Sequence, residues 1–249
     1  MKRMIALILG LILLTASAAA GEGAGKEDTY LFTIREANYE TNKIALTMDD
    51  CREIEQVERT VELCKKYGIA VTFFPLGETL KPEDREIWQS AIDAGCEIGS
   101  HAYFHEYLYK LPTMTVVSSL RRTQQALDET LGYHYEIRWV RPPYGKLKDP
   151  EGTETSAKTV AAIRKAGYDH VVNWSVSQTD PKKAMKEIKP GFIALYHARN
   201  KDVNCLDTII PQLLEKGYEL VTLSDLLGFD PPEISDELYV YNEDDYLGK

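Results

Sequence analysis

The stretch that decides the fold is IALTMDD at residues 44–50, a short apolar run that ends in two adjacent acids. Runs of four to eight apolar and β-branched residues are typical of buried β-strands. From here onward such runs alternate with longer stretches of helical periodicity, which predicts an α/β fold of repeated β-α units around a mainly parallel sheet. Seven strands are expected, at 44–48, 70–74, 97–100, 138–141, 170–174, 192–196 and 219–222. Six helices are expected between them, at 53–67, 82–94, 114–131, 155–166, 181–188 and 205–216.

Polar residues gather at the carboxyl ends of these predicted strands. They are Asp49 and Asp50, His101, Arg141 to Tyr144, Asp180 and His197. In a parallel α/β barrel the carboxyl ends of the strands share one face, and active sites lie there. Side chains that are far apart in the sequence are therefore expected to meet at this one face of the barrel.

Three of these residues have the spacing and chemistry of a metal site. His101 and His105 are four apart, so both imidazoles would lie on one side if the segment turns helically, and Asp50 would complete a three-ligand set. Two His and one carboxylate with an open position are what catalytic Zn²⁺ uses, although Mn²⁺, Fe²⁺ or Co²⁺ also fits such ligands. A His pair alone is as readily two surface or core residues. The chain has only five His, however, and three lie at these strand ends.

The two adjacent acids can divide the work of hydrolysis. Asp50 would bind the metal while Asp49 accepts a proton from the attacking water. Arg141 would pair with Asp49. The alternatives are a turn or helix cap for the acids and an ordinary barrel salt bridge for the arginine.

The ordered motifs resemble those of the polysaccharide deacetylases with the NodB homology domain, carbohydrate esterase family 4. T-F-D-D-G appears as TMDDC at 47–51, H-S/T-x-x-H as HAYFH at 101–105, R-x-P-Y as RPPY at 141–144 and L-x-H as LYH at 195–197. The fourth motif, D-x-x-D-W, is degenerate and reads SQTDP at 177–181. The resemblance implies a distorted, TIM-like (β/α)7 barrel.

The same resemblance implies a mechanism for removing acetyl groups from an N-acetylated polysaccharide or oligosaccharide of the peptidoglycan or chitin type. Asp49 would deprotonate the water, and the backbone N–H of Tyr144 would help to stabilise the oxyanion. His197 would protonate the leaving amine, with Asp180 tuning the charged groups and Arg141 tuning Asp49. The cofactor would be a divalent metal, Zn²⁺ first, held by the three ligands named above.

Four departures from the family pattern bear on substrate and affinity. Ala102 replaces a hydroxyl residue that steadies the metal loop, and Cys51 replaces a glycine beside the ligands. Pro181 replaces the tryptophan of the groove wall, and Ser177 removes an acid. Two alternatives therefore stay open: an O-acetyl esterase acting on an acetylated glycan, and a non-catalytic glycan-binding protein on the same fold.

The first residues indicate export. A basic start, an apolar run at 5–14 and small residues at 15–20 are the layout of a cleavable signal peptide. We expect a signal peptide at 1–20, an N-terminal arm at 21–43, the deacetylase domain at 44–229 and an acidic tail at 230–249. The protein would be secreted or held in the cell envelope, without a membrane span after cleavage.

Charge and cysteine content limit the partners. Loss of two basic residues with the signal peptide takes the formal charge from −10 to −12, since 27 basic residues then face 39 acidic ones. Nucleic acid is thus an unexpected partner, whereas an acetylated glycan is an acceptable one, and we expect a monomer. Four cysteines permit two disulfides in an exported chain, and the topology allows the pairs Cys51–Cys205 and Cys64–Cys96.

Overall fold

The computed structural model describes residues 33–148 and 154–242, and all seven expected strands are present in it. All seven begin and end within two residues of the expected limits, and the third and the fifth are shorter, each ending two residues early. The strands are β2 (Lys43–Asp50), β3 (Thr72–Pro75), β4 (Glu97–Ile98), β6 (Trp139–Val140), β7 (His170–Val172), β8 (Ile193–His197) and β9 (Glu219–Val221).

Parallel pairing arranges these strands as a ring. β2 lies in the middle of the larger sheet: β8 pairs along one side of it, while β9 and β3 pair with the amino- and carboxyl-terminal parts of its other side. β4 extends this sheet beyond β3, while β7 pairs with β6 and with the short β1 (Thr33–Ile34) in a second sheet. The isolated bridges Ser100↔Val140 and Val176↔Ala194 join the two sheets at both edges. The expected α/β architecture is thus confirmed, and the closed ring is a distorted parallel barrel.

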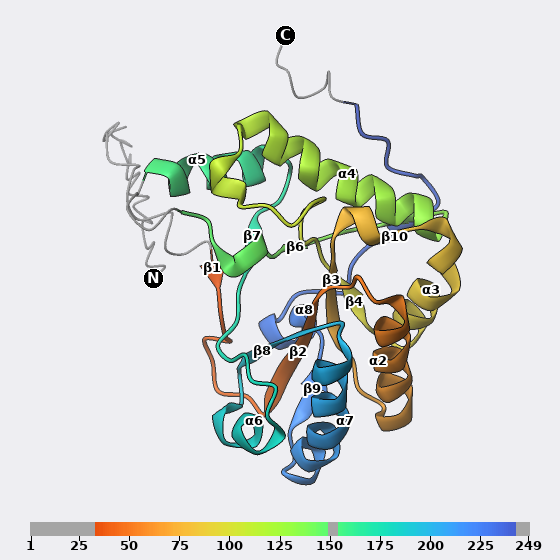
Figure 1. The fold of residues 1–249 in the computed structure, drawn as a ribbon, viewed down its shortest axis with the longest axis vertical. Helices are drawn as coiled ribbons and strands as arrows, with labels where there is room; N and C mark the ends of the chain where they lie inside the picture. The colour runs from red at the N-terminus through yellow and green to blue at the C-terminus, as the bar shows by residue number, and fades with distance from the viewer. Residues whose placement is uncertain (1–32, 149–153, 243–249) are drawn as a thin grey trace, which may run out of the picture.

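Helices surround this ring, as Figure 1 shows. The six expected helices are present, and the additional α8 was not predicted. Their bounds are α2 (Ile54–Tyr67), α3 (Arg85–Asp93), α4 (Thr113–Leu131), α5 (Glu154–Lys165), α6 (Pro181–Glu187), α7 (Asn200–Glu215) and α8 (Leu223–Leu227). Short 3-10 turns stand at Gly77–Thr79, Pro82–Asp84, Leu108–Lys110 and Pro143–Gly145.

Strand β2 separates two apolar clusters because its side chains alternate between its faces. Ile44, Leu46 and Met48 belong to the large cluster that the surrounding helices cover. Ala45 belongs to a second cluster that includes Phe74 and residues of α8. Seven of the eight β2 residues are buried, as expected for a strand with both faces covered.

The amino-terminal end of the ring is held by one buried acid. Glu97, 1% exposed, accepts hydrogen bonds from Trp139 Nε1 at 2.7 Å, from Ser224 N at 3.0 Å and from Thr72 Oγ1 at 3.3 Å. These bonds connect β4, β6, β3 and α8. The carboxylate therefore ties the short helix to the end of the barrel opposite the catalytic motifs.

Both terminal segments lie against the barrel. Ile34 of the N-terminal arm pairs with Val172 of β7, while residues 21–32 of the expected arm lie outside the described residues. At the other end, β10 (Ile234–Ser235) pairs antiparallel with β5 (His134–Tyr135), and Tyr239 N donates to Asp128 Oδ2 at 2.9 Å. Across the described residues, no helix combines the length and apolar character that crossing a bilayer requires.

Candidate metal and catalytic site

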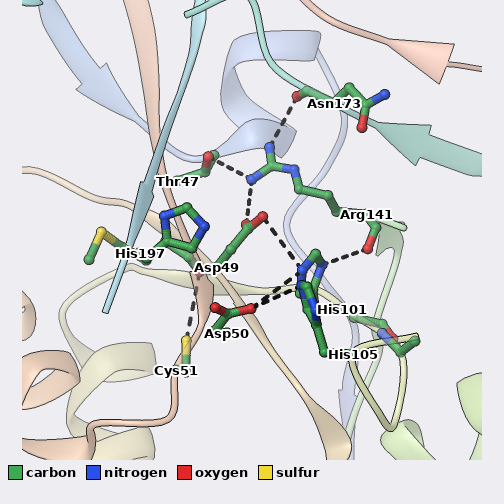
Figure 2. Close-up of polar contacts among 12 residues, drawn as sticks. Thr47, Asp49, Asp50, Cys51, His101, His105, Arg141, Asn173 and His197 are labelled. Atoms are coloured by element: carbon green, nitrogen blue, oxygen red, sulfur yellow. Dashed lines mark hydrogen bonds and ion pairs between the residues drawn. The ribbon is translucent and has the colours of Figure 1, made fainter. Parts of the chain in front are cut away.

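The structure brings most of the predicted site residues together at the carboxyl ends of β2, β4, β6 and β8. Figure 2 shows two aspartates, two histidines and the arginine facing one another, with the ring of His197 beside them. They come from the ends of these four strands or from the loops that follow them. The shared direction of parallel strands therefore gathers them, as the sequence predicted.

Asp50, His101 and His105 form the candidate metal centre. Their ligand atoms all lie within 4.8 Å of one another. Asp50 Oδ1 is 3.6 Å from His101 Nε2 and 3.5 Å from His105 Nε2. This carboxylate oxygen is buried and accepts no hydrogen bond, which is costly unless a cation satisfies it. The donor set and the orphaned oxygen fit a divalent metal.

The backbone between the two histidines differs from the expected helical turn. Residues 101–107 form bends and irregular loop, and Ala102 adopts a positive φ of 67°. The rings nevertheless meet, with centroids 5.3 Å apart. Ala102 N donates to Ser100 Oγ at 3.2 Å, and Gly77 N donates to Ala102 O at 2.9 Å. Other groups thus hold the loop from which the family's hydroxyl is missing.

Contacts outside the three ligands fix their orientation. His101 Nδ1 lies 2.7 Å from Arg141 O, and because a carbonyl only accepts, Nδ1 carries the proton and Nε2 presents its lone pair to the site. Burial lowers the pKa of His101, against the pull of Asp49 and Asp50, which favours the neutral, ligating ring. Arg199 Nη2 donates to Asp50 Oδ2 at 2.9 Å and leaves Oδ1 facing the histidines.

Asp49 and Arg141 form a buried ion pair beside the metal centre. Arg141 Nη1 donates to Asp49 Oδ1 at 2.7 Å and also to Thr47 Oγ1 at 2.7 Å. Nη2 donates to Asn173 O at 3.1 Å, and the guanidinium stacks 4.2 Å from the centre of the Phe74 ring. Burial lowers the pKa of Arg141 and its contact with Asp49 opposes that change. The second oxygen, Asp49 Oδ2, stays within 3.8 Å of His101 Nε2.

His197 ends β8, on the other side of the site from the candidate metal ligands. Its side chain is 30% exposed, and Nδ1 lies 3.6 Å from Asp202 Oδ1. Asp202 raises the pKa of His197 the most, burial opposes the rise, and the charges of Asp49 and Asp50 add to it. The histidine is therefore suited to hold a proton near neutral pH.

Tyr144 stands at the rim of the site. Its ring is stacked on Tyr107 with centroids 4.0 Å apart and meets the His105 ring edge-on at 4.4 Å. The residue is 45% exposed and has a φ of 62°. Its backbone thus takes a left-handed conformation next to a candidate metal ligand, at the place where the resemblance implies an oxyanion donor.

Asp180 is placed differently from the other predicted residues. It is exposed and caps α6, where its Oδ1 accepts from Lys183 N at 2.9 Å. The carboxylate that faces His197 instead comes from α7. Arg199 and Asp202 were both missed by the sequence analysis. The sequence feature that could have located them is an acidic residue in the first turn of a helix that starts shortly after the L-x-H motif.

The four cysteines are free thiols. Cys64 and Cys96 are hydrogen-bonded to each other. Cys51 Sγ is directed at Met48 O, and Cys205 Sγ at Gln178 O. Of the two expected pairs, therefore, Cys64 and Cys96 are in contact as thiols, and neither pair is a disulfide.

The family can now be assigned. The sequence model of the polysaccharide deacetylase family matches residues 36–171, which include the aspartates, both candidate histidine ligands and Arg141. The chain belongs to this family. The matched segment ends before His197. The position of His197 at the end of β8 therefore adds evidence from a part of the chain that the family model does not match.

Known proteins similar to this chain include peptidoglycan deacetylases. The peptidoglycan-N-acetylglucosamine deacetylase PgdA of Listeria monocytogenes is 29% identical over 199 residues, which is 76% of this chain and 40% of that protein. This chain thus spans well under half of that relative. A solved peptidoglycan N-acetylglucosamine deacetylase, Bc1960, is 26% identical with a TM-score of 0.67, covering 80% of this chain and 94% of that one.

One similar structure belongs to a protein described as a pseudoenzyme. It is BA3943 of Bacillus anthracis, a member of carbohydrate esterase family 4. The two chains are 25% identical with a TM-score of 0.67, over 78% of this chain and 68% of that one. These likenesses confirm the (β/α)7 barrel that the motifs implied. They also show that the fold alone does not decide whether a chain is active.

Proposed function

We propose that this protein is a metal-dependent hydrolase that removes N-acetyl groups from a peptidoglycan-like or chitin-like glycan. The observation that carries the proposal is the buried, unpartnered Asp50 Oδ1, which faces the Nε2 atoms of His101 and His105. The free carboxylate oxygen of Asp49 lies next to this centre. A cation site with a base beside it is what hydrolysis of an unreactive amide requires.

The proposed ligands are Asp50, His101 and His105. Zn²⁺ is the first choice for two imidazoles and one carboxylate, and Co²⁺, Mn²⁺ and Fe²⁺ are the alternatives. A divalent cation bound there would supply a Lewis acid that polarises the acetyl carbonyl and acidifies water. The remaining chemistry falls to the side chains of the chain itself.

Asp49 is the proposed base, and Arg141 holds it. Oδ1 is fixed by the guanidinium, so Oδ2 is the atom that accepts a proton from water as its oxygen adds to the acetyl carbon. His197 then gives its proton to the amide nitrogen while the carbon–nitrogen bond breaks, which yields acetate and a free amine. The backbone N–H of Tyr144 is proposed to donate to the carbonyl oxygen as negative charge develops there.

Two alternatives follow from specific observations. An O-acetyl ester needs the same base and metal, so the site also suits acetylated glycans. A non-catalytic glycan-binding role is favoured by the degenerate motif at 177–181 and by the similarity to a pseudoenzyme. The complete constellation of Asp49, Arg141 and His197 favours catalysis over this second alternative.

Release of acetate tests the proposal. The chain from residue 21 onward, loaded separately with Zn²⁺, Co²⁺ or Mn²⁺, is offered N-acetylglucosamine oligomers, peptidoglycan fragments and acetylated xylan. We expect acetate from the N-acetylated glycans and none from the Asp49→Asn variant. Acetate from xylan alone would identify an esterase. Metal-loaded, folded protein that binds these glycans but releases no acetate would exclude the enzyme.

The proposed substrate agrees with the proposed location. Export through residues 1–20, which lie outside the described residues, would bring the protein to the cell envelope or beyond it. The Listeria relative is named for a cell-wall substrate. We propose that this chain meets its glycan there, as a monomer and without a nucleic-acid partner.

A further inference from the structure

The turn that joins β8 to α7 brings a second carboxylate to His197. α7 starts at Asn200, and Asp202 is its third residue. Asp202 Oδ1 accepts a hydrogen bond from His197 N at 3.0 Å and lies 3.6 Å from His197 Nδ1. One oxygen therefore holds the backbone of the histidine and faces its ring.

The surroundings keep this carboxylate in place. Asp202 is only 6% exposed, and its own N–H donates to Arg199 O at 3.0 Å. The N-terminal turn of a helix favours negative charge, so α7 stabilises the ionised acid. Ala198 N donates to Asp49 O at 3.2 Å, which joins the same turn to the strand that carries the proposed base. The histidine is thus held from both sides.

The charges around the imidazole act on its pKa in both directions. Asp202 raises the pKa of His197, with smaller contributions of the same sign from Asp49 and Asp50 on β2. Burial and the guanidinium of Arg199 act in the opposite direction. Since Nδ1 faces Asp202, the other ring nitrogen, Nε2, remains for the leaving group.

The motif that the family pattern would use for this purpose is altered here. Residue 177 is a serine, and Asp180 caps α6 through Lys183 N. Among the described residues, the ion-pair partner of His197 is Asp202. The structure thus contains an acid at the histidine although the motif at 177–181 has lost one.

We propose that Asp202 is the positioning residue of His197, and that it takes over from the degenerate motif the task of orienting the ring and keeping it protonated. This inference rests on the proposed function, in which His197 protonates the leaving nitrogen. It is separable from that function because the contact between Asp202 and His197 exists without substrate or metal.

Two substitutions at Asp202 separate the effect of its negative charge from the effect of its hydrogen bond to the His197 backbone. Asp202→Asn keeps an oxygen that accepts from His197 N but removes the negative charge. Asp202→Glu keeps the charge at a first-turn position where glutamate is well tolerated. Asp207→Asn is the matched control, since it removes one charge from the same helix at a residue 53% exposed and 4.0 Å from Lys66.

The decisive measurement is the pKa of His197, followed by NMR in the metal-free protein. We expect Asp202→Asn to lower it, and Asp202→Glu and Asp207→Asn to leave it raised. Turnover of an N-acetylated oligomer by the metal-loaded Asn variant should fall roughly ten- to a hundredfold, part of what a general acid contributes. Turnover of an O-acetyl ester should fall less, because an alkoxide needs less protonation than an amine.

Two outcomes would overturn the inference. One is a His197 pKa that is unchanged in folded Asp202→Asn. The other is the same unchanged pKa in Asp202→Asn together with a lowered His197 pKa in Asp180→Asn, which would assign the task to Asp180. Failure of the proposed function looks different. In that case the wild-type protein releases no acetate from any glycan, while the titration of His197 still responds to Asp202 as expected.

Discussion

Asp49→Asn is the substitution that tests the site most directly, because it changes one atom and has three separable consequences. Asp49 is 2% exposed, and Oδ1 pairs with a guanidinium that is fully buried. The asparagine keeps the shape of the side chain and an oxygen that can accept from Arg141. It removes both the negative charge and the ability to accept a proton from water.

The magnitudes follow from that geometry. Breaking a buried ion pair by removing one partner lowers the free energy of unfolding by about 3–5 kcal/mol. The lower end is expected, since Arg141 keeps its bonds to Thr47 Oγ1 and Asn173 O. Loss of a general base lowers turnover by roughly 10²–10⁴, which raises the barrier by about 2.7–5.4 kcal/mol. Metal content should stay near one per chain, since Asp49 is not a proposed ligand.

The assay compares urea unfolding, metal content and acetate release on the same preparations. Asp225→Asn is the matched control, because Asp225 pairs with Lys43 at 2.6 Å, close to the 2.7 Å of the buried pair, but is 51% exposed. Its loss should change stability by under about 1 kcal/mol. Near wild-type turnover by folded, metal-loaded Asp49→Asn would refute the assignment of Asp49 as base. An unchanged unfolding midpoint would refute the importance of the buried pair.

Three further outcomes are expected. Asp50→Ala should lose bound metal and acetate release together, and metal retained at full occupancy after dialysis would contradict the ligand set. His197→Ala should retain metal but lose amide turnover by roughly 10²–10⁴, with a smaller loss on an ester, and equal losses on the two substrates would count against a role in protonating the amine. Ser100→Ala should weaken metal binding on the order of tenfold in chelator competition, because Ser100 Oγ supports Ala102 N beside His101; unchanged affinity would show that the remaining bonds suffice.

The sequence predicted the barrel well because its strands are buried on both faces and so appear as uninterrupted apolar runs. Elements fixed by tertiary contacts were not visible in this way. α7 begins at Asn200, five residues before the predicted start, because its first turn is polar and is held by Asp202 rather than by an apolar stripe. The pairing of β10 with β5 was also missed, since two-residue strands carry no periodicity.

The site shows the same division between chemistry and geometry. Residue types at strand ends indicated the proposed metal ligands, the proposed base and the proposed acid. They did not indicate which carboxylate faces His197, since Asp180 and Asp202 are both acids near a helix start. Only the packing of α7 against β8 distinguishes them. Arg199 was likewise invisible, because an arginine two residues after a motif has many possible directions.

Strand geometry raises one remaining difficulty, since neighbouring residues of a regular strand point to opposite faces. Asp49 follows the alternation and points inward with Thr47, both bonded to Arg141. Asp50 should then point toward the helices, yet its Oδ1 lies 3.6 Å from His101 Nε2.

The backbone resolves this difficulty. Asp50 has a φ of 67° and Cys51 a φ of 53°, so the chain leaves the extended conformation at the point where alternation would separate the two acids. Such conformations cost about 1 kcal/mol or more in non-glycine residues and persist only where the surroundings fix them. Here β2 supplies the fixed surroundings, since it pairs with β3 through Asp50 and with β8 through Asp49. The segment that organises the barrel is therefore also the segment that forces the proposed base and the proposed metal ligand, adjacent in sequence, to the same side.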